Sequence, residues 1–138
     1  MIQTSLAVMD AHRQRQISNQ ALLAWHRVRI AHALSQTGEQ WYHALARENS
    51  GTYNNEYMVL DTKRFTARKP LQPGTFWVVN QIPLLVTGRD VTDLLGYGYF
   101  PSYNVPFFQQ VWEEAGYAAA YNKSGDVSLT HALAPRAQ

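Results

Sequence analysis

The sequence predicts an α+β fold that is part of a larger layered domain. Apolar residues recur at helical spacing before residue 47, which is typical of packed helices. Residues 57–60 and 76–79 are apolar on both alternating faces, as in strands of a sheet that is covered on both sides. A few helices and one hairpin cannot supply both covers, so we expect only a section of a layered domain.

The first element expected is a helix that begins near Gln20. Ser18 or Asn19 can cap its start, and Gly38 is placed to end it. Residues 1–17 are polar and irregular, which favours a loosely held flexible arm ahead of a domain segment that covers residues 18–138.

A second helix is expected from Glu39 to about Arg47, followed by a turn-rich break and the two strands. Residues 62–74 carry two prolines and several basic side chains, which indicates a long exposed hairpin loop between antiparallel neighbours. Pro83 ends the second strand because proline cannot donate to a central ladder.

The last third of the chain is expected to be mostly irregular. Residues 90–95 suit a helical turn, and the stretch "GYGYFPSYNVP" is too rich in Gly, Pro and Tyr for regular structure. "PFFQQVWEEAG" suits a helix with proline at its start and Gly116 after its end, before a polar tail from Tyr121.

Composition excludes several classes of protein. The chain has 138 residues, of which 16% are charged, a low share that favours a partner surface. The net charge is +2 and the arginines are scattered along the sequence, so a nucleic-acid partner is not expected. With no cysteine, the chain itself cannot form disulfides, thiolate metal sites or a cysteine nucleophile. No apolar stretch is long enough for a transmembrane segment.

Two pairs of polar residues are candidates for a site. Asn54 and Asn55 precede the first strand, where they either shape an Asx-type turn or direct donors at a ligand. Tyr103 and Asn104 lie between two prolines that stiffen their loop, which suits either a wall of a substrate pocket or a rigid packing loop.

A metal or cofactor is not expected. His26 and His32 are six residues apart, which does not place them on one helix face, and neither they nor His43 have a carboxylate at ligand spacing. Arg27 and Arg29 are interpreted as a solvated helix face and a helix-edge ion pair rather than as a phosphate site. Asn122 begins an N-glycosylation pattern, Asn-Lys-Ser.

Long strings of the sequence resemble the phospholipase B-like proteins, the family that includes the lamina ancestor protein. These strings are "LLAWHRVRIA", "NSGTYNNEYMVLD", "VVNQIP", "TDLLGYGYFPSYNVPFF" and "LAPRA", in the family's order. The resemblance covers residues 22–136 and identifies this chain as an internal to C-terminal segment of such a domain.

The resemblance implies an N-terminal nucleophile hydrolase with an αββα sandwich, of which this chain would be a part. It also implies a secreted or lysosomal glycoprotein, although the start of this chain is not a typical signal peptide. In that family a self-cleaved precursor exposes a terminal cysteine, the proposed nucleophile toward ester or amide bonds of lipid-like substrates. No cofactor is implied.

The chain departs from the family in two respects. It contains no cysteine, so it would neither cleave itself nor catalyse the reaction alone. Family members also commonly carry an acidic residue where Asn80 stands. A complementary chain that carries the nucleophile is therefore an expected partner.

The resemblance also implies a role for the paired asparagines. Acyl transfer needs donors for the oxyanion, and an asparagine amide offers two hydrogens without a charge. Related terminal-cysteine hydrolases use asparagine in this way, so Asn55 first and Asn54 second are the oxyanion candidates. The alternative hypothesis is a truncated, non-catalytic protein or interaction module.

Overall fold

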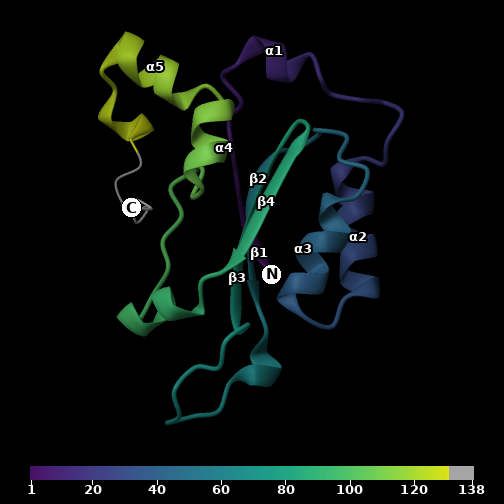
Figure 1. The fold of residues 1–138 in the computed structure, drawn as a ribbon, viewed down its shortest axis with the longest axis vertical. Coiled ribbons are helices and arrows are strands. Elements are labelled where there is room, and N and C mark those ends of the chain that lie inside the picture. Colours follow the sequence, from purple (N-terminus) through teal and green to yellow (C-terminus); the bar gives the residue numbers. More distant parts are fainter. Residues whose placement is uncertain (131–138) are drawn as a thin grey trace.

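The computed structural model describes residues 1–130, which form helices and one antiparallel sheet in the strand order β1-β2-β3-β4 (Figure 1). The strands are β1 (Ile2–Ser5), β2 (Asn55–Leu60), β3 (Phe76–Ile82) and β4 (Leu85–Asp90). The prediction of an α+β fold is confirmed. The expected pairing of the two apolar strands is also confirmed, because β2 and β3 are antiparallel neighbours.

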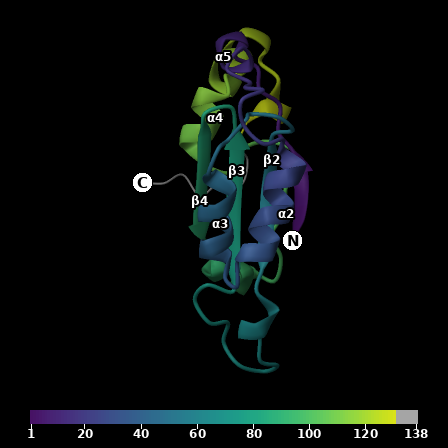
Figure 2. The ribbon, with the colours of Figure 1, turned by 90° about the vertical axis from the view of Figure 1, so that its right-hand side faces the viewer.

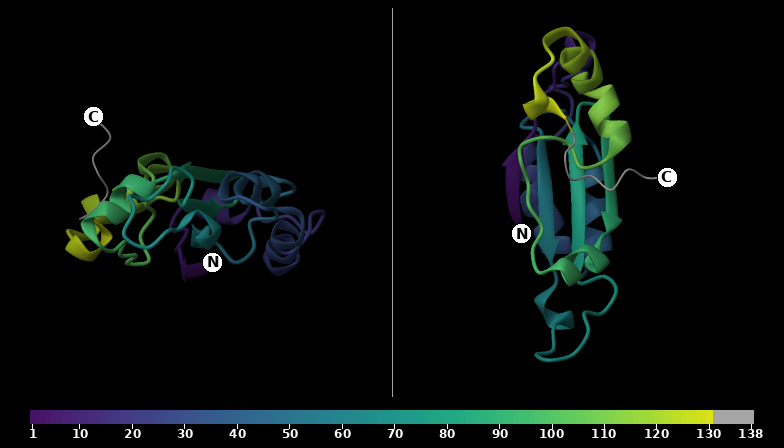
Figure 3. Two further views of the ribbon diagram at one scale, coloured as in Figure 1. Left: turned by 90° about the horizontal axis from the view of Figure 1, so that it is seen from below. Right: turned by 90° about the vertical axis from the view of Figure 1, so that its left-hand side faces the viewer.

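Helices and 3-10 turns cover both faces of this sheet. They are α1 (Ala11–Gln14), α2 (Ala24–Leu34), α3 (Gly38–Ala46), α4 (Gln109–Glu114) and α5 (Tyr117–Ser124), with 3-10 turns η1 (Thr62–Arg64), η2 (Thr92–Tyr97) and η3 (Val127–Leu129). Figure 2 shows α2 and α3 in front of the sheet. On the opposite face, η2 and the segment that leads to α4 run along the strands (Figure 3, right).

The core has a separate apolar cluster on each face, as the two-sided strands predicted. On the helical face Tyr57 and Val79 pack with Trp41 and Leu45. On the other face the cluster consists of Met58, Phe76, Val78, Val91 and Phe107. Residues 1–130 hold one sheet, so the second sheet of the αββα arrangement implied by the resemblance is not among them.

The boundary between the first two helices differs from the prediction. α2 starts at Ala24 rather than near Gln20, and the Ser18 hydroxyl only accepts from the Gln20 amide in a local turn. Gly38 begins α3 instead of ending α2, with Thr37 as the cap that accepts from the Gln40 amide. A Cβ at Gly38 would lie 2.4 Å from a ring carbon of Trp77, so the glycine allows α3 to approach β3 closely.

The first 17 residues are more ordered than expected. Ile2–Ser5 form an edge strand whose register places Ser5 opposite Asn55. Asp10 caps α1 by accepting from the Arg13 amide, and Arg13 forms an ion pair with Glu114 of α4. The expectation of an irregular arm is therefore wrong for these elements, whereas a domain boundary at residue 17 stays a prediction.

Some of the other expected segments are confirmed, and some observed elements were not expected. The exposed loop between β2 and β3 and a helix that ends before Gly116 are confirmed, but that helix starts at Gln109 and not at the proline. The helical turn expected at residues 90–95 lies at residues 92–97. β4 and α5 were not predicted. The string "LAPRA", at residues 133–137, lies outside the described residues.

Candidate functional site

The loop that carries the paired asparagines is held rigidly at one end of the sheet. The side chain of Asn49 accepts from the Gly51 amide at 3.0 Å and donates to the Ile82 carbonyl at 2.8 Å. Gly51 has a φ of +73° and packs against Pro83 in the turn between β3 and β4. These contacts fix the backbone that leads to Tyr53, which also adopts a left-handed φ of 46°.

Arg27 of α2 also holds the loop that carries the paired asparagines in place, through hydrogen bonds to Arg47 and Asn49. Only 3% of this residue is exposed, and its guanidinium donates to the carbonyl of Arg47, the side chain of Asn49 and the side chain of Gln81 at 2.9–3.1 Å. It also donates to the carbonyl of Leu45 near the end of α3. The interpretation of Arg27 as part of a solvated face is therefore wrong. Burial lowers the pKa of Arg27, and the charge is stabilised by acceptors rather than by a carboxylate.

Asn55 is fully buried on the helical face of β2. Its amide donates to the Tyr53 carbonyl at 3.0 Å and to the hydroxyl of Tyr57 at 3.2 Å. Its side-chain oxygen has no hydrogen-bond partner within residues 1–130. Both amide hydrogens of Asn55 thus serve internal acceptors, which orders the turn at Tyr53.

Asn54 is half-buried, and its backbone carbonyl accepts from the Leu6 amide at 2.9 Å. Its side-chain oxygen, like that of Asn55, has no partner in the described part of the chain. The side-chain amide of Asn55 donates to Tyr53 and Tyr57, whereas that of Asn54 donates to no group within residues 1–130, so the Asn54 side chain is less engaged in internal contacts.

The structure brings the second predicted pair toward the same end of the sheet. Asn104 adopts a left-handed φ of 61°, and its amide donates to the Ser5 carbonyl at 2.9 Å. Ser5 is the register partner of Asn55, so Asn104 lies at the same end of the sheet as the paired asparagines. Tyr103 beside it is 64% exposed.

Sequence reasoning missed Glu56, a buried acidic residue. Only 1% of this residue is exposed, and its carboxylate accepts from the Asn80 amide at 3.0 Å and from the Phe107 backbone at 3.2 Å. The Asn80 side-chain oxygen in turn accepts from the backbone of Phe107 at 2.7 Å and of Phe108 at 3.2 Å. The pair therefore fastens the segment after Asn104 to the sheet.

Glu56 forms no ion pair with a cation among residues 1–130. Burial raises the pKa of Glu56, and hydrogen bonds from Asn80, Ser102 and the Phe107 backbone oppose that rise. Glu56 and Asn80 are register partners on β2 and β3. The acidic group that the family resemblance implies at position 80 thus has a counterpart on the adjacent strand. The only sequence signal was an acidic residue directly before the apolar run of residues 57–60.

The remaining candidates lie apart from this end of the sheet. Asn122 is exposed on α5, as a glycosylation acceptor requires. His32 accepts a hydrogen bond from the indole of Trp41 at 3.2 Å, which is a packing contact.

Residues 1–130 contain no group of three or more His, Cys, Asp or Glu side chains that could hold a metal ion. No helix in that range is long and apolar enough to cross a membrane.

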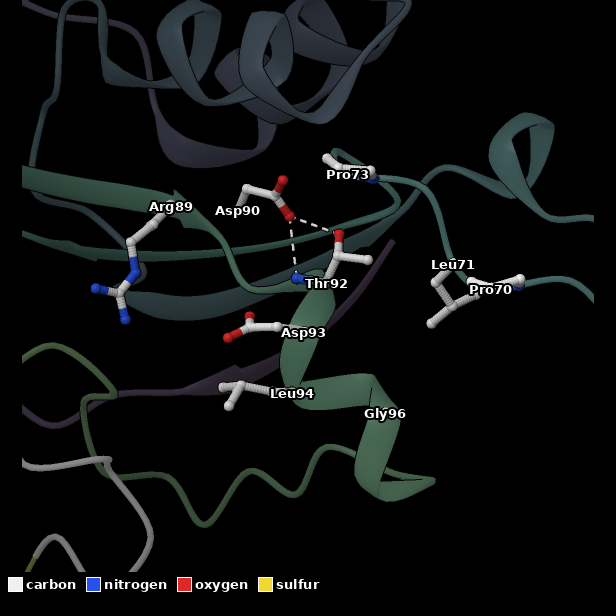
Figure 4. A pocket seen from close by; sticks show the side chains of 9 residues that line it. All are labelled: Pro70, Leu71, Pro73, Arg89, Asp90, Thr92, Asp93, Leu94 and Gly96. Atoms are coloured by element: carbon white, nitrogen blue, oxygen red, sulfur yellow. Dashed lines mark hydrogen bonds between the residues drawn. The ribbon is translucent and has the colours of Figure 1, made fainter.

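A cavity of about 860 Å³ lies at the other end of β3 and β4 (Figure 4). Pro70 and Leu71 of the long loop form one wall, and Thr92, Leu94 and other residues of η2 form the opposite wall. The side chain of Asp90, which lines this cavity, accepts hydrogen bonds from the Gly74 amide at 2.6 Å and from the Thr92 amide. None of the four predicted site residues lines this cavity.

The structure is a segment of an α+β domain, with the predicted asparagines near one end of its sheet. All 138 residues match the family described as Phospholipase B, so the chain belongs to the phospholipase B family.

Curated relatives agree with this assignment. The chain is 39% identical to phospholipase-B 81 of Drysdalia coronoides and 40% identical to phospholipase B-like 1 of Homo sapiens, over all of its 138 residues. It is 35% identical over the same length to phospholipase B-like protein F of Dictyostelium discoideum. The chain spans about a quarter of the length of these relatives.

Proposed function

We propose that the chain is a segment of a phospholipase B-like hydrolase that acts on ester or amide bonds of lipid-like substrates. The observation that carries the proposal is the match of the entire chain to phospholipase B relatives. The position of Asn54, Asn55 and Asn104 near one end of the sheet supports it. In an enzyme with a terminal-cysteine nucleophile, the segment supplies the oxyanion side of the site. The nucleophile comes from another part of the enzyme or from a complementary chain, since these 138 residues contain no cysteine.

The two asparagines have different roles in this proposal. Asn54 donates directly to the oxyanion, because its half-buried side chain is free of the internal bonds that engage the Asn55 amide. Asn55 holds the Tyr53 carbonyl and thereby orients Asn54, and it donates to the oxyanion only where Tyr57 releases it. Asn104 and Tyr103 form the adjacent wall of the substrate pocket.

The experiment is a chimera in which this chain replaces the matching quarter of human phospholipase B-like 1. Hydrolysis of a phospholipid ester and of an N-acyl amide is measured for the chimera and its parent. The proposal requires the folded chimera to retain hydrolysis of at least one substrate class. A folded but inactive chimera beside an active parent would favour the alternative, a non-catalytic protein or interaction module.

Variants of the active chimera test the oxyanion assignment. Loss of one oxyanion donor typically lowers kcat by about 10²–10³-fold. Asn54→Ala should show such a loss with little change in KM, and Asn55→Ala should lower both kcat and thermal stability. Full activity in both variants would remove the asparagines from the site.

A further inference from the structure

The loop between β2 and β3 concentrates positive charge at one end of the molecule. Residues 62–74, hereafter the basic loop, contain Lys63, Arg64, Arg68 and Lys69 and no acidic residue, in a chain whose net charge is +2. The loop projects beyond the end of the sheet and away from both helix layers (Figures 1 and 3). Nothing in the proposed hydrolytic site uses it.

The base of the basic loop is fixed to the sheet. Asp61 pairs with Lys63 and Arg64, and Arg64 also donates to the Pro73 carbonyl at 3.1 Å. Asp90 of β4 accepts from the Gly74 amide on the other side of the loop. Two of the four cations are thus partly neutralised at the base, and the tip is presented on a stable support.

The basic loop carries its remaining charge at Arg68 and Lys69, and it also exposes the aromatic ring of Phe65. Arg68 and Lys69 are exposed, and neither forms an ion pair with another residue between 1 and 130. Phe65 is 59% exposed and is absent from the apolar clusters of the core. An exposed aromatic ring flanked by cations is the composition of segments that enter a membrane interface.

We propose that the tip of the basic loop is a contact site for the surface of an anionic phospholipid bilayer. Arg68 and Lys69 approach the lipid phosphates, and Phe65 enters the boundary between headgroups and acyl chains. A protein partner fits less well, because a narrow projecting loop offers far less than the roughly 800 Å² per partner of a stable protein interface. The site is independent of the hydrolytic chemistry, so either proposal can fail without the other.

The test is cosedimentation of the 138-residue chain with vesicles of phosphatidylcholine alone or phosphatidylcholine mixed with phosphatidylserine. We expect binding to the mixed vesicles and a steep loss as salt rises from about 0.1 M to 0.5 M, since screening shortens the reach of the charges. Each cation near an anionic surface contributes about fivefold in affinity. The double variant Arg68→Glu with Lys69→Glu should therefore weaken binding by at least about 25-fold.

A charge-matched control separates the loop from net charge. Arg29→Glu with Lys123→Glu makes the same change at exposed positions on α2 and α5, and its effect should be much smaller. Phe65→Ser should reduce the binding that survives high salt. Equal losses in the two double variants, or no binding to the mixed vesicles by the parent chain, would overturn the proposal. Binding to an acidic protein or nucleic acid without binding to vesicles would overturn it as well.

Discussion

At the scale of single residues, Glu56 and Asn80 form a buried polar pair between β2 and β3. Both are buried, and together they accept backbone hydrogens from Phe107 and Phe108. A buried acid is costly unless its hydrogen bonds are complete. Either side chain can carry the acid in principle, provided that the other one donates.

The first prediction exchanges the roles of these two residues. Asn80→Asp removes the donor to Glu56 and places two carboxyl groups in contact, which should lower the free energy of unfolding at neutral pH by about 2–4 kcal/mol. Adding Glu56→Gln restores a donor opposite the new acid. The double variant should recover about 1–3 kcal/mol of that loss, measured by urea unfolding. Strictly additive effects would show that the pair is not coupled.

A second prediction concerns the pH dependence that Glu56 brings. Burial raises the pKa of Glu56 in the folded chain above its ordinary value of 4.5. The folded state therefore binds more protons than the unfolded state, so this contribution is fully present below pH 4.5 and lost as pH rises through the folded pKa. Glu56→Gln does not titrate. Its free energy of unfolding relative to the parent chain should rise over that window and then level off, and a difference independent of pH would contradict the assignment.

At the scale of elements, close packing of α3 on β3 depends on a glycine. Gly38 lies in the first turn of α3 against the ring of Trp77, and the helix buries Trp41 and Leu45 in the same direction. Helical periodicity predicted α3, but the glycine was interpreted as a stop signal. The reason for glycine is a contact with a residue 39 positions later, which no local pattern contains.

The third prediction tests that contact. Gly38→Ala should destabilise the chain by about 1–3 kcal/mol, because the added Cβ would lie 2.4 Å from the Trp77 ring. Gly96→Ala is the matched control, since no atom lies within 4 Å of its added Cβ. The control should change stability by less than about 0.5 kcal/mol. If Gly38→Ala and the parent chain unfolded at the same urea concentration, α3 would be able to move away from Trp77 without loss of stability, and the prediction would be wrong.

At the scale of the whole molecule, apolar side chains remain exposed on α2, and the sheet has two open edges within residues 1–130. The segment that leads to α4 covers the face where a second sheet was expected. The exposed apolar residues instead include Ile30 and Leu34 on α2, which are 40% and 70% exposed. β1 and β4 also end the sheet with unpaired outer edges within residues 1–130. Such edges and patches favour association.

The fourth prediction is therefore that the isolated chain self-associates. Sedimentation velocity should show a concentration-dependent increase in sedimentation coefficient. Ile30→Gln with Leu34→Gln should shift the distribution toward monomer, because the two side chains lie one turn apart on the exposed side of α2. A compact, monodisperse monomer at all concentrations would contradict this prediction.

The sequence by itself determined the features that depend on local spacing and composition. The apolar residues on both faces of β2 and β3 predicted a sheet that is covered on both sides. The polar, proline-containing stretch between the two strands predicted an antiparallel pair joined by an exposed loop. The strings around Asn54 and Asn104 were sufficient to place the chain in its family. These features are encoded within segments of a few residues, where periodicity and turn chemistry are read directly.

Only the tertiary structure decided which polar groups meet. Arg27 looked like a surface residue until α3 placed carbonyl groups around it. Glu56 and Asn80 are 24 residues apart in sequence and touch because of strand register. The edge strands β1 and β4 are stabilised by partners that their own sequences do not specify. Burial and hydrogen bonding of a side chain depend on neighbours that are distant in sequence, and the sequence pattern records only neighbours along the chain.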